Sequence, residues 1–568
     1  MRLGGGEPRH GSTGQLPGLS LALRFRPTML AFALLALALQ LPDSAQFAAE
    51  SRRLLAAGRH AEMRWPVLDD VRAQAESLYR ASAWQPLWLE GGRPTAPARA
   101  LAGTLRWAEL RGLDPADFDG VRLQERAERG PMPDAASAAR FDVMLTVDVL
   151  RFARALNVGR IAPRAAHTDL ELAPEAADLL AVVEELRRTA QTDSVLGALE
   201  PQAFGYRRLK AALLRYRALA ADSGLVPLPA LPKRLRPDSV YRGAGAMRRL
   251  LRAVGDLPDS VPVPEADGDT LYDAGLVSAV QAFQRRHGLE ADGVIGPATA
   301  ERLNRPFTLR MRQIELTLER WRWMPRTFES PPIVVNIPGF RLYAFADSGG
   351  RVQPVLTMNV VVGRAYKTRT PVFSARMTYV VFSPYWEVPK SIEREEIRPA
   401  ARRNPGYLAR NRMELVRGGQ VVPVTPGAIA AIGGSVHVRQ RPGDDNSLGR
   451  VKFMLPNAHA VYLHDTPAKA LFETARRDYS HGCIRLQLPV ALAEFVLRDQ
   501  PEWTAERMTQ AMQSERPVTA TLARRIPVLV LYATAVADDA GRVFFYNDIY
   551  GHDRDLDLLL RRGFPYPR

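Results

Sequence analysis

The sequence has very little cysteine. Cys483 is the one cysteine among 568 residues, which excludes an internal disulfide and any metal site built from several cysteines. Most free cysteines are small buried hydrophobic residues. This one has a histidine two positions before it and another at His464, so a reactive thiol is the alternative. The surrounding stretch reads Tyr479-Ser480-His481-Gly482-Cys483-Ile484-Arg485-Leu486.

Lysine is also scarce. The chain has 77 basic residues and a net charge of +16, yet only six of the basic residues are lysines. The arginines are scattered, and no dense basic run with interleaved aromatic residues is present. This pattern does not favour a nucleic-acid partner. A basic protein outside the cytoplasm would still be attracted to the anionic polymers of the cell envelope.

Long apolar runs are absent apart from one near the N-terminus. Residues 29–41 form a 13-residue apolar run that follows Arg24 and Arg26 and precedes several small residues. This order is typical of a secretory signal, and the run is short for a membrane span. We therefore expect residues 1–49 to be a signal peptide with an N-terminal extension, cleaved near Ala45 or Ala49. An uncleaved membrane anchor is the alternative. The predicted location is the periplasm or cell envelope.

The chain is long enough for about two to four domains. Residues 50–242 show helical apolar stripes and end in a proline-rich linker, which predicts a helical scaffold. Residues 243–305 predict a small three-helix domain, and residues 306–329 a connecting helix. From residue 330 to 505 short β-branched and aromatic runs predict an all-β domain. Within it, about residues 391–440 form a charged insertion that would cap one end of the sheet, and residues 506–568 add late strands. The predicted fold class is therefore multidomain α+β.

A motif in the three-helix region suggests a ligand. Asp292-Gly293 is followed by Gly296-Pro297 and Thr299, between a helix with Phe283-Gln284 and one ending in Leu303-Asn304. Glycines permit the turn, and Pro297 suits a first helical position. This stretch resembles the peptidoglycan-binding type 1 domain. The alternative is a plain helical spacer.

The residues around Cys483 suit acyl transfer. A thiol with a pKa of about 8.5 is mostly protonated at neutral pH, and an imidazole such as His464 can remove its proton. Gly482 allows close approach of the backbone, whose amides could bind an oxyanion. Arg485 offers a fork of donors for a carboxylate. His459 and His464 lie five residues apart in a predicted strand, on opposite faces, so we predict no metal site and no cofactor.

This constellation resembles the YkuD-type L,D-transpeptidases. Their signature is a histidine, 14 to 17 residues, and then Ser/Thr-His-Gly-Cys; here fifteen residues separate His464 from Ser480. The long helical region and the wall-binding unit resemble the large YcbB-type subgroup. Further matches are Gly363-Arg364, Thr370-Pro371, Tyr385-Trp386-Glu387-Val388-Pro389, Asn446, Leu448-Gly449, Val451-Lys452-Phe453, Pro456-Asn457 and Asp548-Ile549-Tyr550-Gly551.

The resemblance implies a role for each residue. Cys483 would be the nucleophile and His464 the base, while His481 and Gly482 would fall at the oxyanion hole. Some members of the subgroup lack a histidine at the position of His481, which favours His464 as the base without deciding it. Substrate binding would fall to Arg485, Ser480, Tyr462, Trp386 and Thr466.

The implied reaction is formation of 3→3 peptidoglycan cross-links through a cysteine thioester with release of terminal D-Ala. The partners would be stem peptides, as acyl donor and acceptor, and carbapenems would acylate Cys483. Alternatives are an L,D-carboxypeptidase, if water resolves the thioester, and a non-catalytic peptidoglycan-binding anchor. A papain-like peptidase is disfavoured because those enzymes place the cysteine before the histidine.

Overall fold

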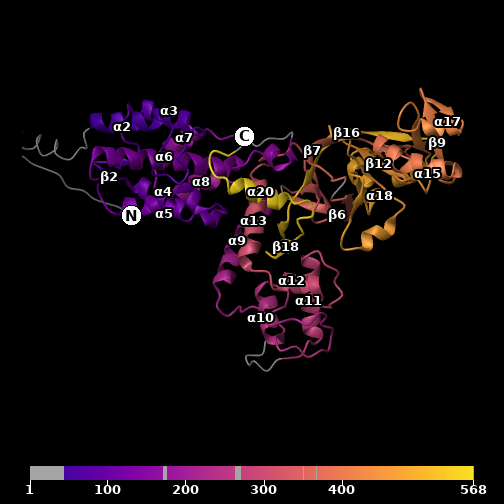
Figure 1. Ribbon diagram of the computed structural model, residues 1–568, viewed down its shortest axis with the longest axis horizontal. Helices are drawn as coiled ribbons and strands as arrows, with labels where there is room; N and C mark the ends of the chain where they lie inside the picture. The colour runs from indigo at the N-terminus through magenta and orange to yellow at the C-terminus, as the bar shows by residue number, and fades with distance from the viewer. Residues whose placement is uncertain (1–43, 171–174, 263–269, 350, 366–367, 567–568) are drawn as a thin grey trace, which may run out of the picture.

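The computed structural model describes residues 44–170, 175–262, 270–349, 351–365 and 368–566, and it shows an elongated molecule of several parts (Figure 1). Helices from the N-terminal part lie at one end and the strands of the C-terminal part at the other. The helices α10 (Ala244–Ala253), α11 (Ala274–Arg286) and α12 (Pro297–Leu303) project to one side. The predicted multidomain class, with helical and β-rich parts, is confirmed. The apolar run at residues 29–41 lies outside the described residues, and none of the described helices is long and apolar enough to cross a membrane.

The N-terminal part is built around one central helix, α6 (Ala135–Val158), which is buried over most of its length. One of the apolar stripes that the sequence shows in this region runs from Phe141 to Leu156 along this helix and lies in the core. The helix stops where Gly159 adopts φ +81°, and a Cβ there would touch the Trp323 ring. Around it lie α2 (Ser44–Ala56), α3 (Arg72–Ala81), α4 (Ala96–Arg106), α5 (Gly120–Glu128), α7 (Leu179–Leu186), α8 (Thr192–Leu199) and the hairpin β1 (Leu89–Glu90) and β2 (Arg93–Pro94).

Helix α2 belongs to this helical body. Phe47, Leu54 and Leu55 are buried, and all three join the core that contains α6. The body therefore includes residues from Ser44 onward, six positions before the predicted start of the scaffold at residue 50. Cleavage at Ala49 would divide a packed helix, whereas cleavage at Ala45 would leave Phe47 in place.

Three short helices form the predicted wall-binding unit. They are α10 (Ala244–Ala253), α11 (Ala274–Arg286) and α12 (Pro297–Leu303), with Pro297 at the first turn of α12. Gln284 explains the turn motif: its amide donates to Asp292 Oδ1 at 3.0 Å, and its Oε1 accepts from Gly293 N at 2.9 Å. The side chain of Gln284 thus fixes the Asp-Gly turn that joins the two helices.

Two long helices connect this unit to the rest of the molecule. They are α9 (Phe204–Ala221) and α13 (Phe307–Trp321). They pack together with the small hairpin of β17 (Ala535–Ala537) and β18 (Val543–Phe545), through a shared core that includes Tyr216 and Phe545. The C-terminal segment therefore helps to join the helical and β-rich parts.

The β-rich part contains a sheet whose strand order closes on itself. The order is β12-β13-β15-β6-β5-β4-β16-β7, and β12 pairs with β7 as well as with β13. The strands are β4 (Ile333–Asn336), β5 (Arg341–Ser348), β6 (Arg351–Gly363), β7 (Val372–Phe382), β12 (Val451–Met454), β13 (Leu463–His464), β15 (Ile484–Leu486) and β16 (Val518–Leu531). Helices α18 (Pro489–Leu497) and α19 (Ala505–Gln513) pack on it. As expected, a late strand, β16, returns to this sheet.

The predicted strand over residues 459–464 is wrong in its first half. Asn457 Oδ1 accepts from the amides of His459 and Val461, and Ala460 has φ +53°. These bonds form a tight turn, so only Leu463 and His464 remain as β13. The side chain of His459 leaves the site and lies 3.3 Å from Asp169 Oδ2. Asp169 belongs to β3 (Thr168–Asp169), a strand from the helical body that pairs with β7.

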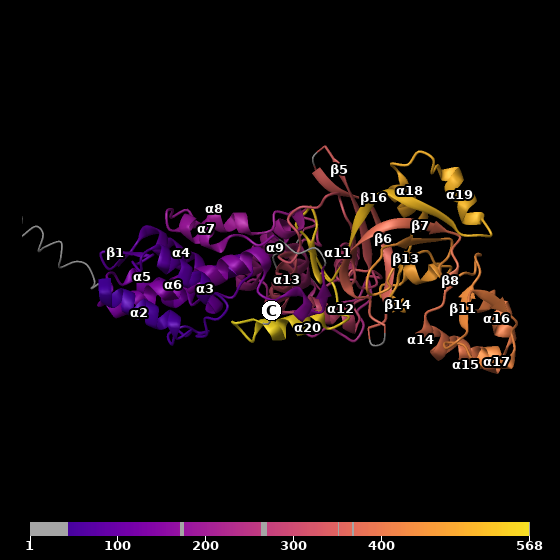
Figure 2. The ribbon, with the colours of Figure 1, turned by 90° about the horizontal axis from the view of Figure 1, so that it is seen from above.

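The predicted insertion is a small lobe with its own sheet and core, set beside the main sheet (Figure 2). Its sheet has the order β10-β9-β11-β8. Its core is separate from that of the main sheet and contains Val388, Leu408 and Ile432. The elements are β8 (Trp386–Glu387), α14 (Lys390–Ile392), a π-helix (Glu393–Ile397), α15 (Arg398–Arg403), α16 (Gly406–Arg410), β9 (Met413–Arg417), β10 (Gln420–Val422), α17 (Pro426–Ala430) and β11 (His437–Gln440).

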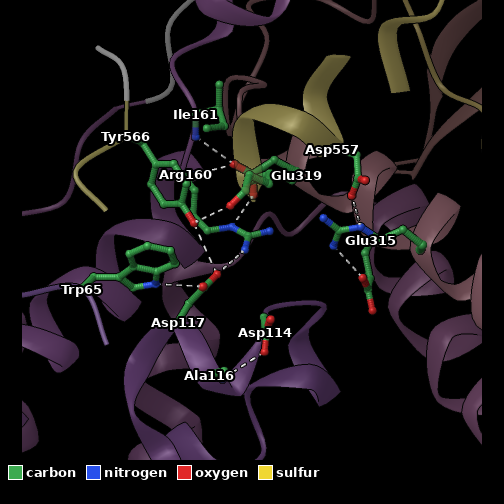
Figure 3. A network of polar contacts seen from close by, with 12 residues as sticks. Trp65, Asp114, Ala116, Asp117, Arg160, Ile161, Glu315, Glu319, Asp557 and Tyr566 are labelled. Carbon is green, nitrogen blue, oxygen red and sulfur yellow. Dashed lines mark hydrogen bonds and ion pairs between the residues drawn. The ribbon is translucent and has the colours of Figure 1, made fainter. Parts of the chain in front are cut away.

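A buried polar network fixes the helical body to α13 and to the C-terminal tail (Figure 3). Glu319 of α13 is fully buried and accepts from the backbone amides of Arg160 and Ile161. Its other oxygen lies 3.1 Å from Arg322 Nη1. Asp117 accepts from Arg160 and from the Tyr566 hydroxyl, which follows α20 (His552–Leu560). This network includes residues that are hundreds of positions apart in the chain.

Candidate active site

Two neighbouring strands place the residues predicted for catalysis. Strand β13 pairs in parallel with β15, with Leu463 opposite Ile484 and His464 opposite Arg485. Leu463 and Ile484 are fully buried in the core. Side chains alternate along a strand, so Tyr462 and His464 share the other face with Cys483 and Arg485. Pairing across the sheet thus brings together residues that lie about twenty positions apart in the sequence.

The Cys483 thiol lies beside polar groups of Ala460 and Tyr462, which precede β13. Its Sγ is 4.0 Å from the Ala460 carbonyl oxygen, and the backbone N–H and the hydroxyl of Tyr462 both hydrogen-bond to it. Burial raises the pKa of the thiol, while the Tyr462 bonds and the charges of Lys452 and Arg485 oppose that rise without cancelling it. The thiol is partly exposed, so the structure shows a protonated and reachable cysteine at neutral pH.

His464 is buried and neutral. Burial and the nearby charge of Arg485 lower its pKa to about 3. Its Nδ1 is 2.5 Å from the Asp465 carbonyl oxygen. A carbonyl only accepts, so Nδ1 carries the proton and Nε2 is left to accept one. The ring lies edge-on to Tyr462, with 5.7 Å between the ring centroids. Among the described residues no hydrogen bond joins the imidazole directly to the Cys483 thiol; Tyr462 contacts both groups.

Asp465 holds the turn that orients His464. Its carboxylate accepts from the amides of Arg450 and Thr466, at 2.9 and 2.7 Å, and pairs with Lys469 at 2.6 Å. Gly449 has φ +59°, and a Cβ there would lie 2.3 Å from Asp465 Oδ2. The Leu448-Gly449 pair noted in the sequence therefore makes room for the carboxylate that fixes the histidine turn.

The loop before Cys483 is fixed by two hydroxyls. Ser480 Oγ accepts from Gly482 N at 3.1 Å and donates to the Cys483 carbonyl at 2.6 Å. Thr370 Oγ1 donates to the Gly482 carbonyl at 2.7 Å. Gly482 itself has φ +115°, a backbone conformation that L side chains rarely adopt. Residues 480–483, called the catalytic loop below because they end at the predicted nucleophile, are therefore held by these bonds in a conformation that favours glycine at position 482.

His481 points away from the thiol, toward the insertion. Its Nε2 lies 2.7 Å from Glu396 Oε1, and the two side chains are about one third and one half exposed. The insertion therefore contacts the catalytic loop at the residue next to Gly482. The imidazole of His481 is not placed at Cys483; its contribution there is limited to the backbone.

The other predicted binding residues fall into two groups. Tyr462 and Arg485 lie near the thiol, and both contribute to its electrostatic environment. Ser480 and Thr466 are buried, and their hydroxyls bond to backbone groups of their own turns. Trp386 is partly buried and packs against the core of the insertion. Ser480, Thr466 and Trp386 therefore make contacts within the protein that hold the turns and the insertion next to the site.

Three cations lie near the thiol or near its loop, and the charge of Glu387 acts on one of them, Lys452. In the described part of the chain, no acidic side chain forms an ion pair with Arg364, Lys452 or Arg485. The charges of Lys452 and Arg485 both act on Cys483 and oppose the rise of its pKa. Burial, and after it the charge of Arg364, lowers the pKa of Arg485. Such a cluster suits an anionic substrate. Within the described residues no group of three or more potential metal ligands occurs.

Sequence reasoning missed three contributors. Asp465 orients His464, although its place next to the histidine is all that the sequence shows of this role. Thr370 was noted only as a motif match, although it bonds to the catalytic loop. Tyr550 lies far along the chain, and no spacing rule connects it with Cys483; its hydroxyl donates to the Gly363 carbonyl at 2.6 Å. The sequence pointed to Thr370 and Tyr550 only because both lie in motifs that match the YkuD-type proteins.

The protonation states predict how Cys483 alkylation depends on pH. The thiol pKa is raised and that of His464 is about 3, so the resting pair is neutral and the thiolate fraction grows as pH rises. The iodoacetamide rate constant should climb between pH 6 and 10, with its midpoint above the value of about 8.5 for a free thiol. A rate that is flat from pH 5 to 8 would instead indicate a preformed thiolate–imidazolium pair and contradict this assignment.

Three parts of the chain match known protein families. Residues 331–518 match the family model described as "L,D-transpeptidase catalytic domain", YkuD. The chain contains a YkuD-type catalytic domain. Residues 244–303 match the "Putative peptidoglycan binding domain", and residues 73–213 match a scaffold domain. Both resemblances noted in the sequence, to the YkuD domain and to the peptidoglycan-binding type 1 domain, are confirmed.

One curated relative comes from Haemophilus influenzae and is named "Putative L,D-transpeptidase". It is 32% identical over 229 residues, which are 40% of this chain and 45% of the relative. The match thus spans less than half the length of that protein. A solved structure, a fused Zn-dependent amidase/peptidase/peptidoglycan-binding domain-containing protein from Clostridium acetobutylicum, is 11% identical. It covers 53% of this chain and 100% of its own, with a TM-score of 0.14.

The YkuD domain begins at β4 and includes Cys483, His464 and the whole insertion. The peptidoglycan-associated domains indicate a cell-envelope location. Tyr550 and α20 follow the last matched residue, 518, and most of β16 does too. The sheet that carries the site therefore includes residues of β16 that lie beyond the matched range.

Proposed function

We propose that this protein is a peptidoglycan L,D-transpeptidase that forms 3→3 cross-links through a thioester on Cys483. The observation that carries the proposal is the pairing of β13 with β15 inside the YkuD domain, which places His464 and Cys483 on one face. The Asp465 carbonyl supports it by leaving His464 Nε2 as the proton acceptor. The peptidoglycan-binding match on the same chain supports a wall substrate.

Acylation begins with transfer of the thiol proton to His464 Nε2. Catalytic contacts are often long before substrate binds and shorten in the complex. The sulfur attacks the carbonyl carbon of the third stem residue and forms a C–S bond. The C–N bond to terminal D-Ala then breaks, and the departing amine takes the proton from His464. The product is a thioester on Cys483 and free D-Ala.

The thioester is resolved by the side-chain amine of a second stem. His464 accepts a proton from this amine as the new C–N bond forms. The C–S bond breaks, and the proton returns to the sulfur. If water attacks in place of the amine, the product is a tripeptide stem, and the enzyme acts as an L,D-carboxypeptidase.

The oxyanion of both steps would be bound by the Cys483 backbone N–H. In the part of the chain that the structure describes, this amide has no acceptor, whereas the Gly482 amide is bonded to Ser480 Oγ. A single donor of this kind is typically worth about 10²–10³ in rate. The backbone at His481 and Gly482 shapes this hole. The imidazole of His481 instead binds Glu396 of the insertion.

Substrate recognition would use the cation cluster of Arg364, Lys452 and Arg485. Stem peptides carry carboxylates, and arginine forks bind carboxylates in two-point contacts. A carbapenem also carries a carboxylate next to its reactive carbonyl, so it would acylate Cys483. We propose the periplasm as the location, reached through a signal within the first 49 residues.

The proposal is tested by incubating purified protein with disaccharide-tetrapeptides and separating the products. Dimers linked 3→3 with release of D-Ala are expected, and Cys483→Ala should give neither. Tripeptide monomers alone would show a carboxypeptidase and reject the transpeptidase. Binding to peptidoglycan sacculi with no D-Ala release and no carbapenem adduct would show a non-catalytic anchor.

A further inference from the structure

The C-terminal segment reaches the catalytic loop through one buried tyrosine. Tyr550 lies between β18 and α20, beyond residues 331–518, and is 2% exposed. Its hydroxyl donates to the Gly363 carbonyl at 2.6 Å and accepts from the Thr370 amide at 3.2 Å. One hydroxyl therefore fixes both the end of β6 and the residue that contacts the catalytic loop.

Thr370 carries this contact to the residue before Cys483. Its Oγ1 accepts from the Gly363 amide at 2.9 Å and donates to the Gly482 carbonyl at 2.7 Å. Thr370 is fully buried, so water does not compete for these bonds. A hydroxyl has one proton, and accepting from Gly363 leaves that proton for Gly482.

Fixing the Gly482 carbonyl also fixes the Cys483 amide. The two groups belong to one planar trans peptide, so the N–H points opposite to the carbonyl. Thr370 holds the carbonyl on one side, and the Cys483 N–H is thereby directed to the other. An oxyanion donor works best when its direction is set before the charge develops.

Tyr550 is itself firmly held. Its amide donates to the Tyr532 hydroxyl at 2.9 Å, and that hydroxyl donates to Asp548 Oδ1 at 2.6 Å. At the other end, Gly363 has no room for a side chain, since a Cβ would lie 1.9 Å from the Thr368 carbonyl oxygen. The connection from Asp548 to Gly482 is therefore an unbroken series of hydrogen bonds, 2.6 to 3.2 Å long, in a tightly packed region.

We propose that Tyr550 is a positioning residue for the oxyanion-binding amide of Cys483, acting through Gly363 and Thr370. This inference rests on the proposed function and assigns the C-terminal segment a part in it. Tyr550 does not touch the reacting atoms. Its hydroxyl limits rotation of the Gly482–Cys483 peptide and leaves the thiol and His464 unchanged.

Two reactions of the same cysteine test this role. Acylation by a carbapenem or a tetrapeptide develops an oxyanion, whereas alkylation by iodoacetamide attacks a CH₂ carbon and develops none. In Tyr550→Phe we expect acylation and kcat for D-Ala release to fall about tenfold, less than the roughly 10²–10³-fold for loss of a donor itself. The KM and the alkylation rate should stay within twofold. Tyr546→Phe is the matched control, because Tyr546 is buried in the same segment and its hydroxyl makes no hydrogen bond to any described residue.

A second variant keeps the test decisive if Tyr550→Phe is unstable. Thr370→Val should also slow acylation and spare alkylation, and the double variant should be no slower than Thr370→Val alone. Equal losses in acylation and alkylation, or no loss in either, would overturn the positioning role. If wild-type protein releases no D-Ala, the proposed function fails; if wild type is active and Tyr550→Phe matches it, this inference alone fails.

Discussion

His464→Gln should lower the rate constant for acylation of Cys483 by about 10²–10⁴-fold, the usual contribution of a general base. Glutamine can still donate to the Asp465 carbonyl, but it has no nitrogen that accepts a proton. The wild-type imidazole is neutral above its pKa of about 3 and is therefore ready to accept. Stopped-flow measurement with a carbapenem gives the rate constant directly.

The pH profile of this variant distinguishes a base from a structural residue. Since the pKa of the Cys483 thiol is raised, the residual acylation in His464→Gln should increase with pH and approach wild type under alkaline conditions, where the thiolate forms unaided. His167→Gln is the control, as His167 is exposed and pairs with Asp555 of α20. A loss that stays constant at all pH values would contradict the role of His464 as base.

Glu319→Gln should destabilise the folded protein by about 3–5 kcal/mol, the usual cost of removing one partner from a buried ion pair. Glu319 and Arg322 have no exposed side-chain surface, and Arg160 has almost none. The neutral amide would leave Arg322 without an acidic side chain within reach, while Arg160 would keep Asp117. Thermal or urea unfolding checks the loss. Glu315→Gln is the matched control on α13, because the Glu315–Arg312 pair is partly exposed and should matter by less than about 1 kcal/mol.

The loss of stability in Glu319→Gln should depend on pH. Burial raises the pKa of Glu319, but Arg160, Arg322 and two backbone amides outweigh burial, so the pKa is lowered. A carboxyl with a lowered pKa contributes its full stability above its unfolded value of about 4.3, and this contribution is lost as pH falls through the folded pKa. The gap between wild type and Glu319→Gln should thus be constant from pH 7 to about 5 and narrow in more acidic solution. A gap that widens in acid would reject this assignment.

The sequence predicted elements whose cause is local. The stripe along α6, the turn at Asp292-Gly293 and the first turn of α12 at Pro297 follow from spacing and from the residue types themselves. The position of His464 relative to Cys483 followed from a motif. The strand expected from residue 459 was half wrong, because the side chain of Asn457 bonds to the backbone and outweighs the β propensity of the residues that follow.

Contacts across the fold could not be predicted. Glu396 meets His481, and Tyr550 meets Gly363, only because the insertion and the C-terminal segment fold back on the sheet. Pairing of Asp169 with β7 likewise depends on packing between the helical body and the sheet. These contacts join residues 85 to over 180 positions apart, and no periodicity or spacing rule extends that far.

The central claim is that Cys483 becomes acylated by a stem peptide as D-Ala leaves. The most direct measurement is mass spectrometry of protein quenched in acid during turnover of a disaccharide-tetrapeptide, followed by trypsin digestion. Cleavage after Arg477 and Arg485 releases a peptide of residues 478–485 that contains Cys483. The account predicts that this peptide carries the donor without its terminal D-Ala, as a thioester cleaved by hydroxylamine. Release of D-Ala with this peptide unmodified, or with the donor attached elsewhere, would contradict it.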